Sequence, residues 1–256
     1  MKKCLVWLLM LVLLLSGCGS ADGFTPKEGE TCAPYKIVDV SEYEGKYSVL
    51  AYNYESERPE LTFVGVSNAE IMDESGRTIT AADLKPGMVI EVIWDGMVAE
   101  SWPCQIWVDE VRVAEQQDDL VGLYRTVLND LWENDSALNH DAELLGLDFS
   151  TLTNLPEMEK DALAYLFSCD VGLGLEYVFG TWEELRDQGY IDGENLYWEN
   201  GVFFSLQLVG EPGEGSFTFD AEKWRSGLGA IFYTDCAAKR GTAGQWTYEP
   251  GGFAIS

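Results

Sequence analysis

The spacing of apolar residues changes near residue 116, and this change limits the chain to two kinds of structure in succession. Before it lie short runs of β-branched and aromatic residues, such as "YKIVDV", "LTFVGV" and "QIWVDEVRV", which are typical of strands. After it, Leu120, Tyr124 and Val127 recur at the three- and four-residue spacing of an amphipathic helix. The sequence therefore predicts two domains, all-β over 35–116 and helix-containing over 117–256.

The first of these domains is expected to be a small barrel. Its strand-like runs meander through about 80 residues with turn signals between them, a pattern that favours a closed or nearly closed OB-like barrel. Asp95-Gly96 stands between Ile93-Trp94 and Met97-Val98. Because both turn residues tolerate positive φ, the pair predicts a two-residue hairpin.

The second domain is expected to have an α+β fold, with helices first and an antiparallel sheet after them. A second helix is predicted from Pro156 to Phe167, and a third follows Thr181, which forms a capping-box pair with Glu184 and ends at Gly189. Strands are then predicted in "NLYWE", "VFFSLQLV", "SFTFD", "GAIFYTDCAAK" and "QWTYE", with a hairpin at Asn200-Gly201. By analogy of fold, this order favours a cystatin-like or NTF2-like arrangement.

The amino-terminal segment predicts export. Residues 5–15 form an apolar run of eleven residues, whereas a membrane-spanning helix needs about 20. Lys2 and Lys3 precede the run and small residues follow it, as in a secretion signal. We expect a signal peptide over 1–17 and, because Gly, Ser, Pro and charged residues follow, a flexible spacer over 18–34.

The end of this signal, Leu15-Ser16-Gly17-Cys18, resembles the lipobox of bacterial lipoproteins. The resemblance implies that the Cys18 thiol carries a diacylglycerol and that cleavage occurs just before it. The mature chain would then be anchored on the extracellular face of the cell membrane. The alternative is a secreted protein that is cut elsewhere and carries no lipid.

Two further stretches resemble known families. The stretch "TITAADLKPGMVIEVIWDGMVAESWPCQI" resembles the YobA-like domains of small bacterial lipoproteins, and "GLYRTVLNDLWENDSALN" through "WRSGLGAIFYTDC" resembles the second domain of uncharacterised lipoproteins from Gram-positive bacteria. The first resemblance implies an OB-like fold and an extracytoplasmic location. Neither family carries an assigned activity, so no catalytic residue is transferred.

The charge of the chain restricts its partners. It has 44 acidic and 16 basic residues, a formal net charge of −28. A field of this sign repels phosphate backbones and raises the local concentration of cations. Nucleic acid is therefore excluded as an expected partner, and basic ligands are favoured.

Motifs for catalysis and cofactors are missing from the sequence. His140 is the single histidine, which rules out a multi-histidine zinc site. A Ser-His-Asp arrangement would have to use this residue, whose acidic neighbours indicate a surface position instead. "GLGLEYVFG" and "SGLGA" match no phosphate-binding motif. We therefore expect no cofactor and no catalytic residue.

An acidic cluster near the end of the first helix is the candidate cation site. Its carboxylate members are Asp130, Glu133, Asp135 and Asp141, accompanied by Asn139 and Glu143. The spacing does not fit the EF-hand loop. A solvated acidic face and a weak cation site both remain open.

Trp224 and Arg225 are the candidate ligand contacts, since they interrupt an otherwise acidic chain. An arginine beside a tryptophan can hold a carboxylate or stack on a sugar ring. In the alternative interpretation, Trp224 closes the core and Arg225 pairs with a neighbouring acid.

Four cysteines remain after the signal and the lipobox: Cys32, Cys104, Cys169 and Cys236. An even number in an exported protein permits disulfides, and the two-domain division favours Cys32–Cys104 and Cys169–Cys236. The alternative is four thiols buried as small apolar side chains.

Three functions remain from the sequence. The favoured one is a non-catalytic lipoprotein that binds a ligand, an envelope polymer or a protein partner at the cell surface. The second is an extracellular hydrolase of glycosidase type, which uses two carboxylates and needs no histidine. The third is a structural lipoprotein of an envelope complex.

Overall fold

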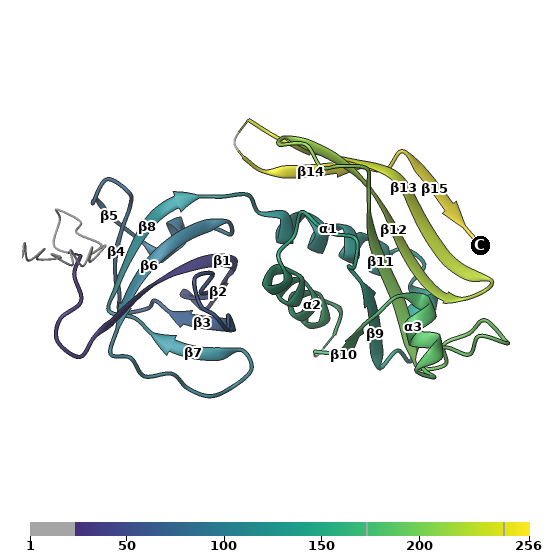
Figure 1. Cartoon of the computed structure of the whole chain (residues 1–256), viewed down its shortest axis with the longest axis horizontal. Coiled ribbons are helices and arrows are strands. Elements are labelled where there is room, and N and C mark those ends of the chain that lie inside the picture. Colours follow the sequence, from purple (N-terminus) through teal and green to yellow (C-terminus); the bar gives the residue numbers. More distant parts are fainter. Residues whose placement is uncertain (1–23, 173, 243) are drawn as a thin grey trace, which may run out of the picture.

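The computed structural model describes residues 24–256 except 173 and 243, so the expected signal peptide and Cys18 lie outside the described residues. The described chain is rich in strands and forms two mixed sheets, seen on the left and right of Figure 1. Within it, no helix combines the length and apolar character needed to cross a membrane.

The first sheet has eight strands in the order β5-β4-β8-β6-β1-β2-β3-β7. Their bounds are β1 Thr31–Tyr43, β2 Lys46–Tyr52, β3 Leu61–Gly65, β4 Glu70–Met72, β5 Thr78–Ile79, β6 Met88–Trp94, β7 Cys104–Trp107 and β8 Glu110–Gln116, with a 3-10 turn at Ala81–Asp83. The expected β-rich first part is confirmed. The sheet is nevertheless open, with β5 and β7 at its ends, so of the two expected forms, a closed and a nearly closed barrel, the closed one is wrong.

The predicted hairpin at Asp95-Gly96 is also wrong. Gly96 has the positive φ (+81°) that suits a tight turn, but residues 97 and 98 form no strand. Ile93 in β6 already pairs with Cys32 of β1 on one side and Glu110 of β8 on the other. Because both edges of β6 are occupied, no hairpin partner can join it.

The expected spacer is shorter than the sequence suggested. β1 begins at Thr31, inside the range 18–34, and its first residues pair with the end of β6. Phe24, the first described residue, is 5% exposed. The part of the spacer from Phe24 onward therefore belongs to the folded structure.

The second sheet and its helices follow β8. The helices are α1 Leu120–Glu133, α2 Glu157–Val171 and α3 Trp182–Asp187, with a 3-10 turn at Ser136–Asn139; the strands are β9 Leu144–Asp148, β10 Glu176–Phe179, β11 Gly201–Val209, β12 Ser216–Ser226, β13 Gly229–Arg240, β14 Trp246–Glu249 and β15 Gly252–Ile255. The three predicted helices are confirmed.

Local signals fix the ends of these helices. The Asp119 carboxylate accepts a hydrogen bond from the Gly122 N–H at the start of α1 (2.7 Å). Thr181 and Glu184 form the expected capping box on α3. Gly189 has a φ of +85° just after α3, as a left-handed C-terminal cap requires.

The sheet itself is not the purely antiparallel one that the sequence predicted. β9 and β10 were not predicted, and β9 pairs in parallel with both β10 and β11. The reason is that α2 connects β9 to β10 and α3 lies between β10 and β11, and helical crossovers produce parallel pairs. Gly201 opens β11 and pairs with Leu144, so the hairpin predicted at Asn200-Gly201 is not formed, and "NLYWE" makes only isolated bridges.

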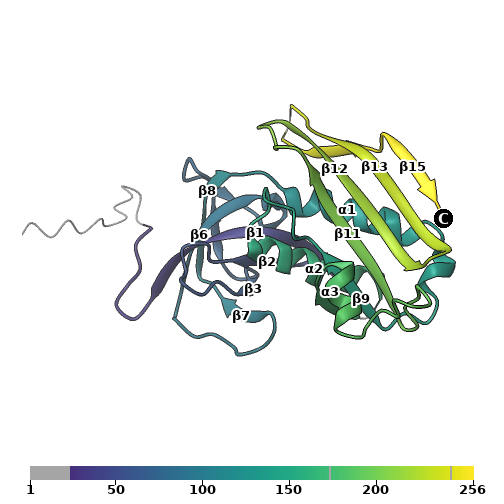
Figure 2. The ribbon, with the colours of Figure 1, turned by 45° about the vertical axis from the view of Figure 1, so that its right-hand side comes forward.

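Helices α1 and α2 lie between the two sheets (Figures 1 and 2). They share one apolar core with four side chains of the first sheet, Val38, Leu50, Tyr52 and Leu61. α3 packs on the opposite face of the second sheet, where Leu185 joins a smaller core with Trp198 and Trp224. The two sheets are thus joined by packed side chains as well as by the chain.

The expected disulfides are not formed. Cys32 and Cys169 are exposed, whereas Cys104 and Cys236 are buried, and no bridge joins Cys32 to Cys104 or Cys169 to Cys236. Cys104 contacts the Thr62 hydroxyl at 3.1 Å. Cys236 lies in the main core, where burial raises the pKa of its thiol to about 12. Cys104 and Cys236 are therefore buried as the alternative interpretation expected of all four thiols, whereas Cys32 and Cys169 are not.

Candidate functional site

The candidate site follows from the parallel part of the second sheet. The chain leaves β9 toward α2 on one face of the sheet and leaves β10 toward α3 on the other face. In open sheets with helices on both faces, ligands bind in the crevice outside the carboxyl ends of two such strands. A cavity of about 320 Å³ lies at this place, between the amino-terminal ends of α2 and α3. We call it the β9/β10 cleft.

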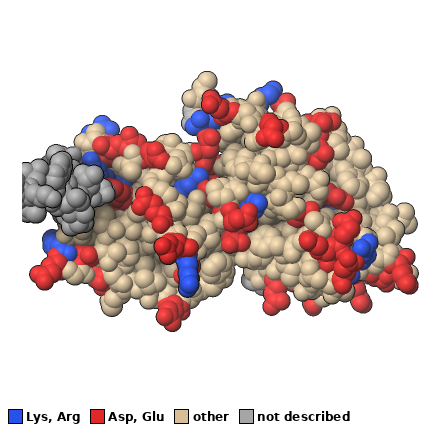
Figure 3. Space-filling model, in the orientation of Figure 1, with Lys and Arg blue, Asp and Glu red and all other residues tan. Residues whose placement is uncertain are grey.

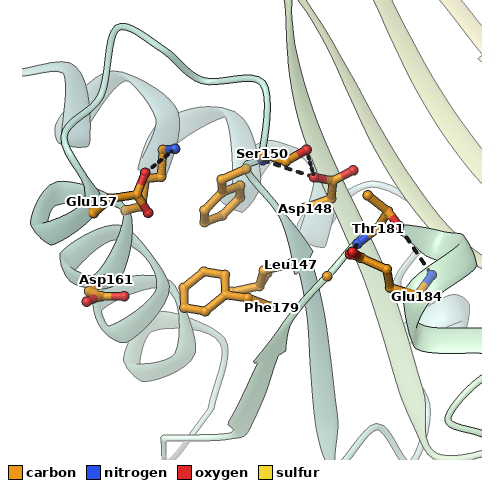
Figure 4. A pocket seen from close by; sticks show the side chains of 11 residues that line it. Leu147, Asp148, Ser150, Glu157, Asp161, Phe179, Thr181 and Glu184 are labelled. Carbon is orange, nitrogen blue, oxygen red and sulfur yellow. Dashed lines mark hydrogen bonds and ion pairs between the residues drawn. The ribbon is translucent and has the colours of Figure 1, made fainter. Parts of the chain in front are cut away.

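One wall of the β9/β10 cleft is aromatic. The rings of Phe149 and Phe179 meet edge to face, with centroids 6.0 Å apart. Phe149 is buried, while Phe179 is 43% exposed. Leu147 extends this apolar wall (Figure 4).

Asp148 supplies a buried carboxylate at the end of β9. It is 5% exposed, and its Oδ1 accepts hydrogen bonds from the Ser150 N–H (3.0 Å) and hydroxyl (2.6 Å). These bonds hold the side chain in the manner of an Asx-turn. None of the described residues donates a hydrogen bond to Oδ2. One oxygen of a buried carboxylate is therefore available at the cleft.

The first turns of α2 supply the opposite side of the cleft. The Lys160 ammonium lies 2.7 Å from Oε1 of Glu157. Asp161 is half-buried and has no hydrogen-bond or ion-pair partner among the described residues. Burial raises the pKa of Asp161, and the nearby Glu157 charge raises it further.

The α3 side of the cleft is held by its capping box. Oε2 of Glu184 accepts the Thr181 N–H at 2.9 Å, and the Thr181 hydroxyl accepts the Glu184 N–H. The Glu184 side chain is therefore fixed where it lines the cleft.

A further acidic side chain, that of Glu222, lies behind Asp148. Ser205 of β11 pairs with Asp148 on one side and with Glu222 of β12 on the other, so the three side chains form a row on one face of the sheet. Burial raises the pKa of Glu222 to about 7, and the Asp148 charge contributes to the rise. Negative charge in this row is therefore poorly compensated.

Trp224 and Arg225, the ligand contacts that the sequence suggested, serve the fold. Trp224 is buried and meets the Trp182 ring edge to face at 5.6 Å. The Arg225 guanidinium donates to the backbone carbonyls of Leu138, His140 and Glu199. Trp224 thus closes the core as the alternative held, while Arg225 binds carbonyls instead of an acid.

The side chains of the acidic cluster near the end of α1 do not gather into a metal-binding group within the described part of the chain. No group of three or more His, Cys, Asp or Glu side chains in the described part of the chain is placed to hold a metal ion. Asp130 accepts the Tyr248 hydroxyl, and His140 contacts Asp141 at the surface. The Glu133 carboxylate has no hydrogen-bond or ion-pair partner within the described part of the chain, and Asp135 offers its backbone oxygen to Lys223.

The cation at this helix end is the ammonium of Lys223. This buried side chain donates to the carbonyls of Trp132, Asn134 and Asp135 at 2.8–3.2 Å. It also lies 5.8 Å from the centre of the Trp132 ring. Burial lowers the pKa of Lys223 to about 8. A lysine thus occupies carbonyls that could otherwise have attracted a bound cation.

Sequence reasoning did not find the β9/β10 cleft. The Asp148-Phe149-Ser150 turn was a readable local signal, since aspartate two residues before serine favours an Asx-turn. Asp161 and Phe179 carried no such signal, because they reach the cleft only through the packing of α2 and β10.

Comparisons with known proteins do not identify a family. No family model matches the chain, and no curated protein matches it. Among solved structures, an aspartyl tRNA synthetase from Entamoeba histolytica aligns with 76% of this chain at 8% identity and a TM-score of 0.26. The alignment spans 47% of that protein. A similarity this weak carries no argument about fold or activity.

Proposed function

We propose that the chain is a bacterial lipoprotein, anchored on the extracellular face of the membrane, that binds a ligand in the β9/β10 cleft without converting it. The observation that carries the proposal is Asp148, a 5% exposed carboxylate that lines a cavity and keeps one oxygen available. Burying a charge is costly unless a partner compensates it. A ligand that contacts Asp148 would supply the missing partner.

The resemblance to lipoprotein families belongs to the same proposal. The short strands and turns of residues 35–116 support an OB-like assignment and the YobA-like resemblance, although the sheet is open. Helices α1 and α2, laid together on one face of a curved sheet, support the cystatin-like or NTF2-like assignment (Figure 2), although α3 lies on the other face and β9 adds parallel pairs. The expected partner is an envelope component, either a polymer or a protein.

The lipid anchor is tested by labelling. We expect labelled palmitate to enter the wild-type protein in its bacterial host and to be absent from Cys18→Ala, because Cys18 is the only cysteine in the lipobox-like segment. The variant should also leave the membrane fraction for the medium. Labelling that survives the substitution would refute the anchor.

Ligand binding in the β9/β10 cleft is tested by asking whether the protein retains a small molecule during gel filtration. The soluble chain from residue 19, incubated with an extract of its own envelope and separated by gel filtration, should carry a small molecule visible by native mass spectrometry. Phe179→Ala should reduce retention at least tenfold, because it removes the exposed half of the aromatic wall. Val209→Ala, an equally exposed residue at the end of β11, is the control. Equal retention by wild type and Phe179→Ala would place the ligand elsewhere.

A hydrolase remains the second candidate because of Asp161. Its burial raises its pKa, as a general acid requires, and Asp148 lines the same cleft. Incubating the protein with the retained molecule distinguishes binding without conversion from hydrolysis. Conversion of a glycan substrate, abolished by Asp161→Asn, would favour the hydrolase over simple binding.

A further inference from the structure

We infer that the β9/β10 cleft binds a linear aliphatic diamine, a short methylene chain with an ammonium group at each end. The inference rests on the proposal that this cleft is the ligand site, and it names the chemical class of the ligand. Its grounds are the charges at the two sides of the cleft and the apolar wall between them.

The charge of the cleft favours a cation. Four carboxylates line it, those of Asp148, Glu157, Asp161 and Glu184, and Lys160 is its one lining ammonium. Lys160 is already paired with Glu157. Acidic side chains are also scattered across the face of the molecule in Figure 3, with few basic ones among them. Such a field attracts cations and repels anions.

The carboxylates lie in two groups. In Figure 4, Asp148 and Glu184 lie on the side of α3, whereas Glu157 and Asp161 lie on α2 across the cleft. On the first side, Oδ2 of Asp148 is available. On the second, the whole Asp161 carboxylate has no partner among the described residues. Each side can therefore accept one ammonium group.

The space between the two groups is apolar. Leu147 and Phe179 lie between them in Figure 4, and the Phe149 ring meets that of Phe179 at 6.0 Å. A methylene chain would remove this surface from water, gaining roughly 25 cal/mol for each Å² of apolar area. The rings also favour an ammonium at either end of the chain through cation–π attraction. A sugar or another neutral polyol would leave the carboxylates without compensating charge.

The volume limits the length of the ligand. A cavity of about 320 Å³ falls at the lower end of the range for small-molecule sites. It suits a chain of a few methylene groups. We therefore expect 1,4-diaminobutane or 1,5-diaminopentane to fit better than longer polyamines.

Isothermal titration of the soluble chain at pH 7 tests the inference. The probes are 1,4-diaminobutane, butylamine and 1,4-butanediol, which share the methylene chain and differ in the number of charges. We expect the diamine to bind at least tenfold more tightly than butylamine, and the diol not to bind. Asp161→Asn should remove the advantage of the diamine over butylamine, because one end loses its counter-charge while the fold keeps all its hydrogen bonds.

Two controls keep the result interpretable. Glu74→Gln removes the same charge from an exposed turn of the first sheet and should leave diamine affinity unchanged. Asp148→Asn should weaken the binding of both amines, with circular dichroism confirming that the variant is folded.

An equal affinity for diamine and butylamine, or a diamine affinity insensitive to Asp161→Asn, overturns the inference. If the cleft retains an envelope molecule that depends on Phe179 but is not an amine, the proposed function stands and the diamine is wrong.

Discussion

Replacing Lys36 with methionine should lower the free energy of unfolding by about 3–5 kcal/mol, the usual cost of removing one partner of a buried ion pair. The Lys36 ammonium lies 2.6 Å from Oε1 of Glu159, and the two side chains are 13% and 2% exposed. The Tyr52 hydroxyl contacts the same oxygen at 2.9 Å. Without Lys36, the Glu159 carboxylate would remain buried with one neutral donor.

This loss should affect both sheets together. Lys36 and Tyr52 belong to the first sheet and Glu159 to α2, within reach of the core that joins the sheets. Urea unfolding followed by circular dichroism and by tryptophan fluorescence should therefore give coincident transitions for the wild type and for Lys36→Met. Separate unfolding transitions for the two sheets would contradict the conclusion that packed side chains join them.

A double variant separates the charge effect from packing. Lys36→Met with Glu159→Leu removes both charges and should recover most of the stability lost by Lys36→Met alone. The surface pair Arg77–Asp73 supplies the control, since the Arg77 side chain is 81% exposed. Arg77→Met should change stability by less than about 1 kcal/mol. A Lys36→Met effect no larger than this would show that the buried pair contributes little.

Replacing Glu222 with glutamine should stabilise the protein above pH 7 by about 3 kcal/mol. The pKa of Glu222 rises from 4.5 to about 7 in the folded protein, and one pKa unit corresponds to about 1.4 kcal/mol. Below pH 4.5, the Glu222 carboxyl is protonated in both the folded and the unfolded protein, so it does not lower the free energy of unfolding. As pH rises from 4.5 through 7, its ionisation beside Asp148 destabilises the fold.

The pH dependence distinguishes this effect from a change in packing. Urea titrations at pH 4.5, 6 and 8 should show Glu222→Gln nearly equal to the wild type at pH 4.5 and increasingly more stable at pH 6 and pH 8. Glu74→Gln, at an exposed turn, should show no such trend. A stability difference that stays constant with pH would mean that ionisation of Glu222 is not the cause.

Local sequence signals predicted the helices well and the strand partners poorly. The caps at Asp119 and Thr181 and the left-handed Gly189 act within three or four residues, so a short window of sequence contains all the atoms involved. The turn at Asp95-Gly96 also had the expected positive φ at its glycine. It failed as a hairpin because β1 and β8, from distant parts of the chain, already held both edges of β6.

The cysteines and the charged clusters also depend on contacts between distant parts of the chain, which local sequence signals do not predict. An even number of cysteines permitted bridges, but pairing depends on where β1, β7, α2 and β13 place each side chain, and they place two outside and two inside. In the sequence, Lys223 is simply one basic residue in an acidic chain. Only the packing of β12 against the end of α1 brings its ammonium to three carbonyls some 90 residues away.

By itself, the sequence determined the change from strands to helices, the ends of the helices, the acidic field and the absence of multi-histidine chemistry. Each of these depends on composition or on atoms close together along the chain. Only the tertiary structure decided the β9/β10 cleft, the row of Asp148, Ser205 and Glu222, and the contact of Lys36 with Glu159 across 123 residues. Such contacts form because burial of apolar surface selects which elements pack together, and polar side chains then find partners that no local spacing specifies.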